Sequence, residues 1–272
     1  MKQLKVIIFN LILLSVSIIT IIPFVWMLVS SFKPNSEIVK IGGSFLPDSF
    51  TIQNYINVQE RFEFLRMFGN SLFIAIIVTG AVIYTSAIVG FVLAKYEFKG
   101  RQVIFGLILG TMMIPWAVTI IPRYDMIVRF GWLDNYIALI LPSVFSGFGI
   151  FLLRQNIMTI PDDVIEAARM DGASEWYIFH RVILPMSRNA ISSIAIFQFL
   201  WVWEDFLWPY LIINTQSKQL IAVGLKLFNG QYGTDYGGLF AATTISIIPV
   251  ILVYVTFQKR FIAGISGAAV KG

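Results

Sequence analysis

Long runs of apolar residues, separated by shorter polar segments, dominate the chain. The runs have about 20 residues, enough at roughly 1.5 Å per helical residue to cross a hydrocarbon core of about 30 Å. Short segments of alternating apolar and polar residues are absent. We therefore predict an all-α, polytopic membrane protein with one transmembrane domain (residues 1–272) and six transmembrane helices, at about 6–30, 69–94, 102–122, 136–153, 189–213 and 238–258.

Composition agrees with the pattern and excludes several kinds of chemistry. The chain is 57% hydrophobic and only 13% charged, a balance typical of residence in a bilayer. It has no cysteine and a single histidine, His180, which argues against a disulfide framework, a cysteine nucleophile or a His-cluster metal site. We expect no metal site. The basic residues behind the net charge of +5 are interpreted as a signal for the orientation of the spans in the membrane, and not as a sign of nucleic-acid binding.

Charge in the short loops predicts the orientation. The side that holds both termini carries 12 of the 20 Lys and Arg residues, and the shortest loop contributes Lys95, Lys99 and Arg101. Under the positive-inside rule both termini are predicted to be cytoplasmic. The first run, preceded by Lys2 and Lys5, is too long for a signal-peptide core and is predicted to remain as an anchor. Prolines such as Pro115 and Pro142 can kink the runs in which they occur.

The segment 154–188 is consequently cytoplasmic, and it contains a helix, a glycine turn and a second helix. Pro161 can occupy a first-turn position, followed by acidic residues that favour a helix N-terminus. Gly172 is expected to end the first helix in a left-handed conformation, and Ser174 to cap the second. Pro185 marks the entry into the fifth apolar run.

Two interpretations of this segment fit its physical chemistry. In the first, Ala167 and Ala168 let a partner protein approach the backbone, Glu166 and Arg169 make charged contacts, and the aromatic residues Trp176, Tyr177 and Phe179 act as anchors. In the second, an amphipathic helix pair lies on the inner leaflet and contains an intrahelical pair between Glu166 and Arg169.

The segment resembles the EAA loop of ATP-binding-cassette (ABC) import permeases. That motif is Glu-Ala-Ala, three residues, Gly, nine residues, Ile, any residue, Leu-Pro, and this chain departs from it only in Val182, which replaces the isoleucine. The matching residues are Glu166, Ala167, Ala168, Gly172, Leu184 and Pro185, and Asp171 with Ala173 completes a form common in sugar permeases. Further segments resemble the MalG type of oligosaccharide permease, namely Asn70-Ser71, Met113 to Pro115, Phe206 to Pro209 and Ala269 to Gly272.

The resemblance implies a function and a set of partners. The chain would be the permease subunit of an ATP-driven importer in the cytoplasmic membrane of a bacterium or archaeon, taking up an oligosaccharide or another carbohydrate. Its partners would be a second homologous permease, two ATPase subunits, an extracytoplasmic binding protein and membrane lipid. The EAA loop, with Arg169 among its docking residues, would receive the ATPase. The chain has no Gly-Lys dipeptide and so no phosphate-binding loop, which places ATP and Mg²⁺ in the partner ATPase and leaves this chain without a cofactor or catalytic residue.

The fifth run contains polar and aromatic residues that are candidates for the translocation pathway. Carboxylates cost about 2.5 to 3.5 kcal/mol near a bilayer centre, so they are expected to face protein or water. The candidates are Gln198, Trp201, Glu204, Asp205 and Trp208. An aromatic belt with a structural carboxylate is the alternative for these residues. The two acids also leave open a proton-coupled secondary carrier that uses Glu204 or Asp205 as its relay.

Overall fold

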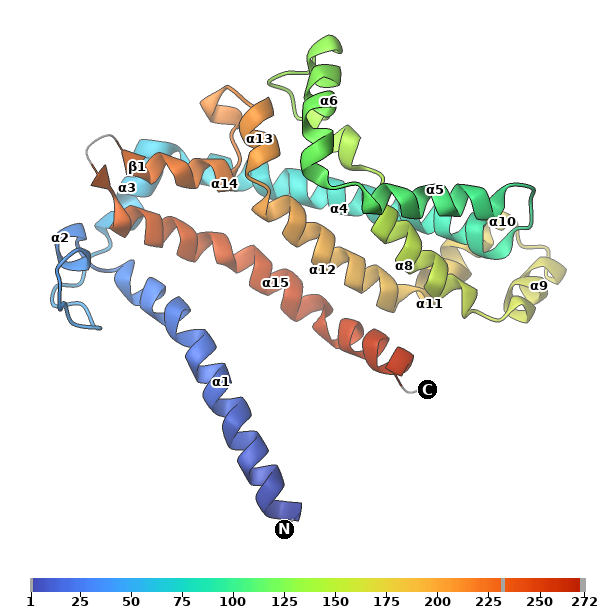
Figure 1. The fold of residues 1–272 in the computed structure, drawn as a ribbon, viewed down its shortest axis with the longest axis horizontal. Helices are drawn as coiled ribbons and strands as arrows, with labels where there is room; N and C mark the ends of the chain where they lie inside the picture. The colour runs from blue at the N-terminus through green and yellow to red at the C-terminus, as the bar shows by residue number, and fades with distance from the viewer. Residues whose placement is uncertain (1, 231–232, 270–272) are drawn as a thin grey trace. The chain divides into compact units, whose positions relative to one another are not determined.

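The computed structural model describes residues 2–230 and 233–269, and the described part is almost entirely helical. The long helices are α1 (Lys2–Ser30), α4 (Phe64–Lys95), α5 (Arg101–Met113), α6 (Trp116–Arg129), α8 (Gly147–Met158), α12 (Arg188–Glu204) and α15 (Tyr236–Ala269). The only sheet among the described residues is an antiparallel pair of two-residue strands, β1 (Asn229–Gly230) and β2 (Gly233–Thr234). The predicted all-α class is confirmed (Figure 1). The C-terminal residues 270–272 of the resemblance lie outside the described residues.

Shorter helices connect these elements. They are α2 (Asn35–Ile38), α3 (Gln53–Phe62), α7 (Ile137–Ile140), η1 (Leu141–Ser143), α9 (Asp162–Met170), α10 (Glu175–Ile178), η2 (Phe179–Ile183), α11 (Leu184–Met186), α13 (Leu207–Ile212), η3 (Gln216–Lys218), α14 (Ile221–Gly224) and η4 (Leu225–Phe228). The chain forms two compact units. Unit 1 comprises residues 1–68 and 223–248, and unit 2 comprises residues 69–222 and 249–272.

Unit 1 joins the end of α1 to α3. The buried Asn54 side chain donates hydrogen bonds of 2.8 Å to the carbonyl oxygens of Ser31 and Lys33. These bonds satisfy two carbonyl groups in the segment directly after α1, which ends at Ser30. Lys33 Nζ also lies 3.7 Å from the Glu37 carboxylate, with both side chains buried. The polar segment after α1 is thereby fixed as a set of short helices.

Unit 2 contains the main buried core, to which α4, α8 and α12 contribute. Small residues allow close packing between α4 and α8, because a Cβ on Gly90 would lie 3.0 Å from the Arg154 nitrogen and one on Gly149 would lie 2.5 Å from Ser86 Oγ. The large buried side chains around this contact include Leu153, Ile157, Ile183 and Ile194.

The apolar runs do not all form straight spans. Four helices are long and apolar enough to cross a membrane, or six if each of two bent helix pairs counts as one span. The predicted span 102–122 is bent within its length, because α5 and α6 meet at 100° (Figure 1). Pro115 causes the break, since it forces Ile114 into an extended conformation and lacks an N–H. The predicted span 189–213 is likewise interrupted after Glu204, where α12 ends and a separate α13 begins at Leu207.

Candidate functional site

The EAA loop (residues 154–188) forms the predicted helix, glycine turn and helix. α9 begins at Asp162. We had expected Pro161 in the first turn, but it occupies the N-cap position directly before that turn. Gly172 has a φ of +79°, and its N–H donates to the Arg169 carbonyl at 3.0 Å while the Ala173 N–H donates to that of Ala168, also at 3.0 Å. These two bonds form a Schellman motif, the usual glycine-dependent helix ending.

Ser174 caps α10 as predicted, by accepting a 3.2 Å hydrogen bond from the Tyr177 N–H. The two helices therefore hold a defined angle that backbone hydrogen bonds fix locally. The loop surface is consequently a shaped surface and not a flexible connection.

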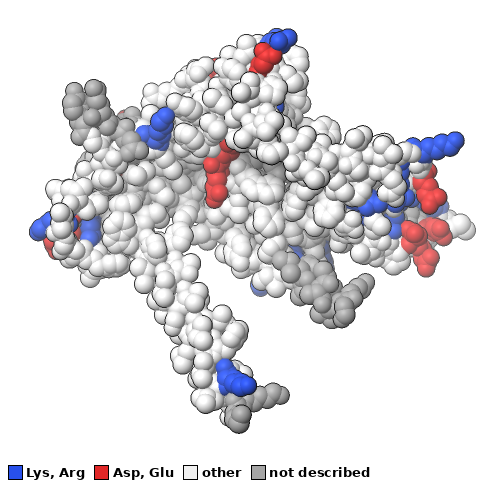
Figure 2. Space-filling view, viewed as in Figure 1, with Lys and Arg blue, Asp and Glu red and all other residues white. Residues whose placement is uncertain are grey.

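The loop turns one set of side chains into unit 2 and another set outward. Ile165 is 2% exposed, and Ala168 and Ala173 pack against the core. The residues Glu166, Ala167, Met170, Asp171 and Gly172 are exposed, as are Trp176 and Tyr177 of α10. In Figure 2 charged side chains gather over α9 and α10. The outward face thus combines charge, small residues and two exposed aromatic rings, which are features of protein interfaces.

Each of the two interpretations of the loop is wrong in one detail. Arg169 does not pair within its helix with Glu166, since its Nε lies 2.7 Å from the Glu175 carboxylate across the glycine turn. The hydrogen bonds from Arg169 and from the Tyr96 hydroxyl hold the pKa of Glu175 below its usual value. Phe179 cannot anchor a partner, because it is 3% exposed.

Leu184 and Pro185 end the loop in the short helix α11. Leu184 is half-buried and Pro185 is exposed. Directly before them, η2 is a turn of π-helix, and the helical segment then bends by 75° into α12. The bend separates the loop helix from the fifth apolar run.

The structure separates the five pathway candidates. Gln198 is buried and Trp201 is exposed, whereas Glu204 is exposed and the half-buried Asp205 accepts a 3.3 Å hydrogen bond from the Trp208 N–H. Trp208 is 3% exposed and donates from Nε1 to the Ala138 carbonyl at 3.1 Å. Of the five candidates Trp201 and Glu204 are therefore the exposed ones, Asp205 reaches the surface in part, and Trp208 belongs to the core.

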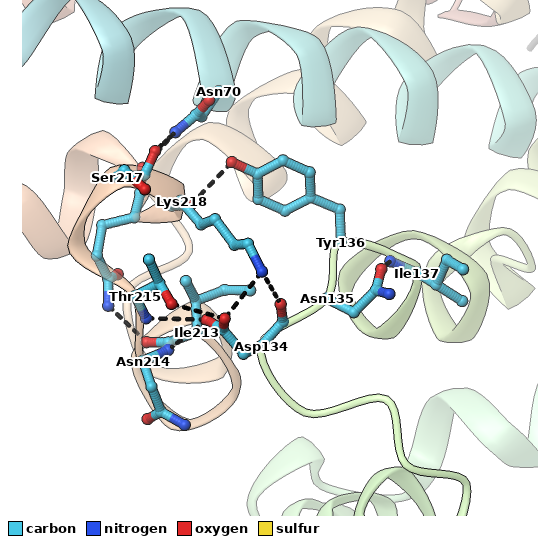
Figure 3. A network of polar contacts seen from close by, with 11 residues as sticks. Asn70, Asp134, Asn135, Tyr136, Ile137, Ile213, Asn214, Thr215, Ser217 and Lys218 are labelled. Carbon is cyan, nitrogen blue, oxygen red and sulfur yellow. Dashed lines mark hydrogen bonds and ion pairs between the residues drawn. The ribbon is translucent and has the colours of Figure 1, made fainter.

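The sequence reasoning missed a polar network centred on Asp134, which we call the Asp134 network (Figure 3). The Asp134 carboxylate accepts hydrogen bonds from the Asn214 N–H at 3.0 Å, the Thr215 N–H at 2.9 Å and the Lys218 ammonium at 2.8 Å. Tyr136 donates to the Lys218 carbonyl at 3.1 Å. The signal in the sequence was the Asp-Asn pair at 134–135, a combination that favours turns.

A second missed contact involves Arg123, whose guanidinium carbon lies 4.6 Å from the centre of the Trp208 ring. Among the residues that the structure describes, no group of three or more His, Asp or Glu side chains could hold a metal ion.

The fold and the loop define the class of the protein as a helical membrane protein with several spans and a capped helix–turn–helix loop between two of them. Residues 86–267 match the family model described as binding-protein-dependent transport system inner membrane component. The chain belongs to this family of ABC-importer permease subunits. This membership gives no support to a proton-coupled secondary carrier.

Individual relatives match almost the whole chain. Arabinooligosaccharides transport system permease protein AraQ of Halalkalibacterium halodurans is 31% identical over 260 residues, which cover 94% of this chain and 93% of AraQ. Diacetylchitobiose uptake system permease protein NgcG of Streptomyces coelicolor is 36% identical over 254 residues, which cover 92% of this chain and 84% of NgcG. The crystal structure of a bacterial ABC transporter involved in the import of the polysaccharide alginate has a TM-score of 0.84 at 24% identity, covering 93% and 95% of the two chains, and it supports the fold.

Proposed function

We propose that this chain is the permease subunit of an importer for oligosaccharides, and that the outward face of α9 and α10 receives a separate ABC ATPase. The observation that carries the proposal is the Schellman ending at Gly172, which presents Glu166, Ala167 and Asp171 beside the exposed rings of Trp176 and Tyr177. ATP and Mg²⁺ would bind to the ATPase. Relatives named for arabinooligosaccharides and diacetylchitobiose support a sugar oligomer as the substrate.

The complex would also contain a second, homologous permease and an extracytoplasmic binding protein that delivers the sugar. In this arrangement both termini and the EAA loop are cytoplasmic. Two contacts support the assignment of the loops to sides. Lys95, which borders the short cytoplasmic loop after α4, pairs at 2.6 Å with Asp162 of the EAA loop, whereas Lys218 pairs with Asp134 at 2.8 Å between two segments assigned to the outside. Trp201 and Glu204, the two exposed candidates of α12, are proposed to line the pathway.

Purification of the assembled complex tests the function directly. The chain would be expressed with the ABC ATPase, second permease and binding protein of the same organism, and ATP hydrolysis measured with binding protein that had been loaded with arabinooligosaccharide, diacetylchitobiose or glycerol 3-phosphate. We expect the ATPase to co-purify, and a loaded sugar oligomer to stimulate hydrolysis. Uptake that persists after ATP depletion with an intact proton gradient would contradict the proposal.

The docking role of the loop can be tested at Gly172. A Cβ there meets no atom of this chain within 4 Å, so Gly172→Val acts within the chain through backbone strain. A non-glycine residue in the left-handed region costs about 1–2 kcal/mol, so we expect uptake per complex to fall roughly five- to thirtyfold. Gly172→Asn is the matched control, since Asn tolerates this conformation. Equal uptake by the valine variant, at equal abundance in the membrane, would count against the docking model.

A further inference from the structure

The second half of the EAA loop packs on α4. The buried Phe179 ring lies 5.9 Å from that of Phe91 and 6.0 Å from that of Tyr84. Tyr84 also lies within 3.3 Å of His180 Nε2 through its hydroxyl. Aromatic pairs at these separations add to the free energy of burial. The loop therefore packs against α4 through apolar contacts, although α8 and α12 are the long helices that flank it in the sequence.

Polar contacts fix both ends of α9 to the C-terminal end of α4. Lys95 Nζ, on a side chain that is 6% exposed, pairs with Asp162 at 2.6 Å and donates to the Ile160 carbonyl at 2.5 Å. The Tyr96 hydroxyl donates to the Glu175 carboxylate, which is also paired with Arg169. Asp162 is in the first turn of α9 and Arg169 in the last. A force on the exposed face of α9 would consequently act on α4.

The other end of α4 holds the segment that forms the Asp134 network. Asn70 Nδ2 donates to the carbonyl oxygens of Ser217 and Gln219 at 3.0 and 3.1 Å. Ser71 Oγ accepts a 2.7 Å hydrogen bond from the Ile221 N–H. Figure 3 shows Asn70 reaching from α4 to this segment, whose Lys218 side chain is bound to Asp134. The same helix thus contacts both polar sites.

α4 is suited to carry movement between these contacts. It contains no proline between Phe64 and Lys95, and the stretch from Asn70 to Tyr96 is roughly 40 Å long at 1.5 Å per residue. Along it Ile74, Val78 and Val82 are buried in the core. The α5–α6 and α11–α12 segments are instead bent by 100° and 75°. A straight, packed helix transmits displacement better than one with a break.

We propose that α4 links the ATPase-docking loop mechanically to the Asp134 network, with Lys95 and Tyr96 as positioning residues at one end and Asn70 at the other. This inference rests on the proposed function, because the docked ATPase supplies the movement. The Asp134 network lies in segments assigned to the outside, which is the side on which the proposed binding protein delivers the sugar. α4 then relates the nucleotide state inside to the conformation of the outer loops.

The test compares Tyr96→Phe and Asn70→Ala with the wild-type complex. Tyr254→Phe is the matched control, since this exposed tyrosine of α15 is not part of either contact. We expect co-purification of the ATPase and its basal hydrolysis to be unchanged, and stimulation by loaded binding protein to fall roughly two- to thirtyfold in each variant, the range for residues within a coupling network. A wild-type level of stimulation in Tyr96→Phe would overturn the inference.

The double variant distinguishes a link in series from two local effects. If α4 carries the coupling, Tyr96→Phe with Asn70→Ala loses about as much stimulation as the more severe single variant, whereas independent effects would multiply.

The chain has no cysteine, so a fluorophore on Gln216→Cys can report on the conformation of the outer segment. We expect ATP to change its emission in the wild-type background and less in Tyr96→Phe. If the ATPase does not co-purify with the wild-type chain, the proposed function is refuted. If the wild-type complex is active but the two single losses of stimulation multiply in the double variant, only the role of α4 is refuted.

Discussion

Asp134 has a left-handed backbone conformation, with a φ of +56°, which aspartate tolerates better than most residues. This conformation lets its own N–H donate to the Ile212 carbonyl at 2.9 Å while its carboxylate accepts from the segment 214–218. The Lys218 ammonium, followed by the Thr215 N–H, holds the pKa of Asp134 below its ordinary value. One side chain therefore fixes two loops that are far apart in the sequence.

Acidification should remove this contribution to stability. The unfolded-state pKa of aspartate is about 3.9, and the folded-state pKa is lower, so the ionised carboxylate favours the folded state fully above that pH and progressively less below it. We expect Asp134→Asn to lower stability by about 1 kcal/mol at pH 7, since solvent screens this partly exposed pair. Thermal unfolding in detergent from pH 7 to pH 3 should show the difference in Tm shrinking below about pH 4. A difference that does not change with pH would contradict this assignment.

At the scale of the element, the break between α12 and α13 gives two adjacent acids different environments. Asp205 adopts an extended conformation and accepts the Trp208 N–H in the first turn of α13, whereas Glu204 ends α12 with an exposed side chain. Aspartate shortly before a helix is a capping signal, and this signal at Asp205 could have predicted the start of α13.

Separate substitutions of Asp205 and Glu204 should distinguish a structural role at this break from a role in transport. Asp205→Ala removes an acceptor for a helix N-terminus and should destabilise the protein by about 1 kcal/mol, measured as a lower Tm. Glu204→Ala should leave stability within about 0.5 kcal/mol and change the apparent KM for uptake of the sugar. Unchanged KM and rate in Glu204→Ala would leave this residue outside the pathway.

The helix endings and caps were predictable from the sequence, whereas helix angles and long-range side-chain contacts were not. The ending of α9 at Gly172 and the cap at Ser174 depend on residues within one helical turn, so sequence patterns suffice to find them. Pro115 marked a kink, but the size of its bend depends on how α5 and α6 pack. The choice of Glu175 over Glu166 as the partner of Arg169 depends on the angle of the glycine turn. Asp134 and Lys218 are 84 residues apart, beyond the reach of any local pattern.

At the scale of the whole molecule, the orientation of the spans ties every proposed role to a side of the membrane. Because the chain is free of cysteine, single cysteines report topology without a background. We expect Gln216→Cys to react with a membrane-impermeant maleimide added to intact cells. Lys99→Cys, in the short loop between α4 and α5, should react only in inverted membrane vesicles. Both positions lie outside the long helices, so accessibility depends on the side of the membrane. Reaction of Lys99→Cys in intact cells would reverse the orientation, moving the EAA loop away from any cytoplasmic ATPase and removing the basis of the docking proposal.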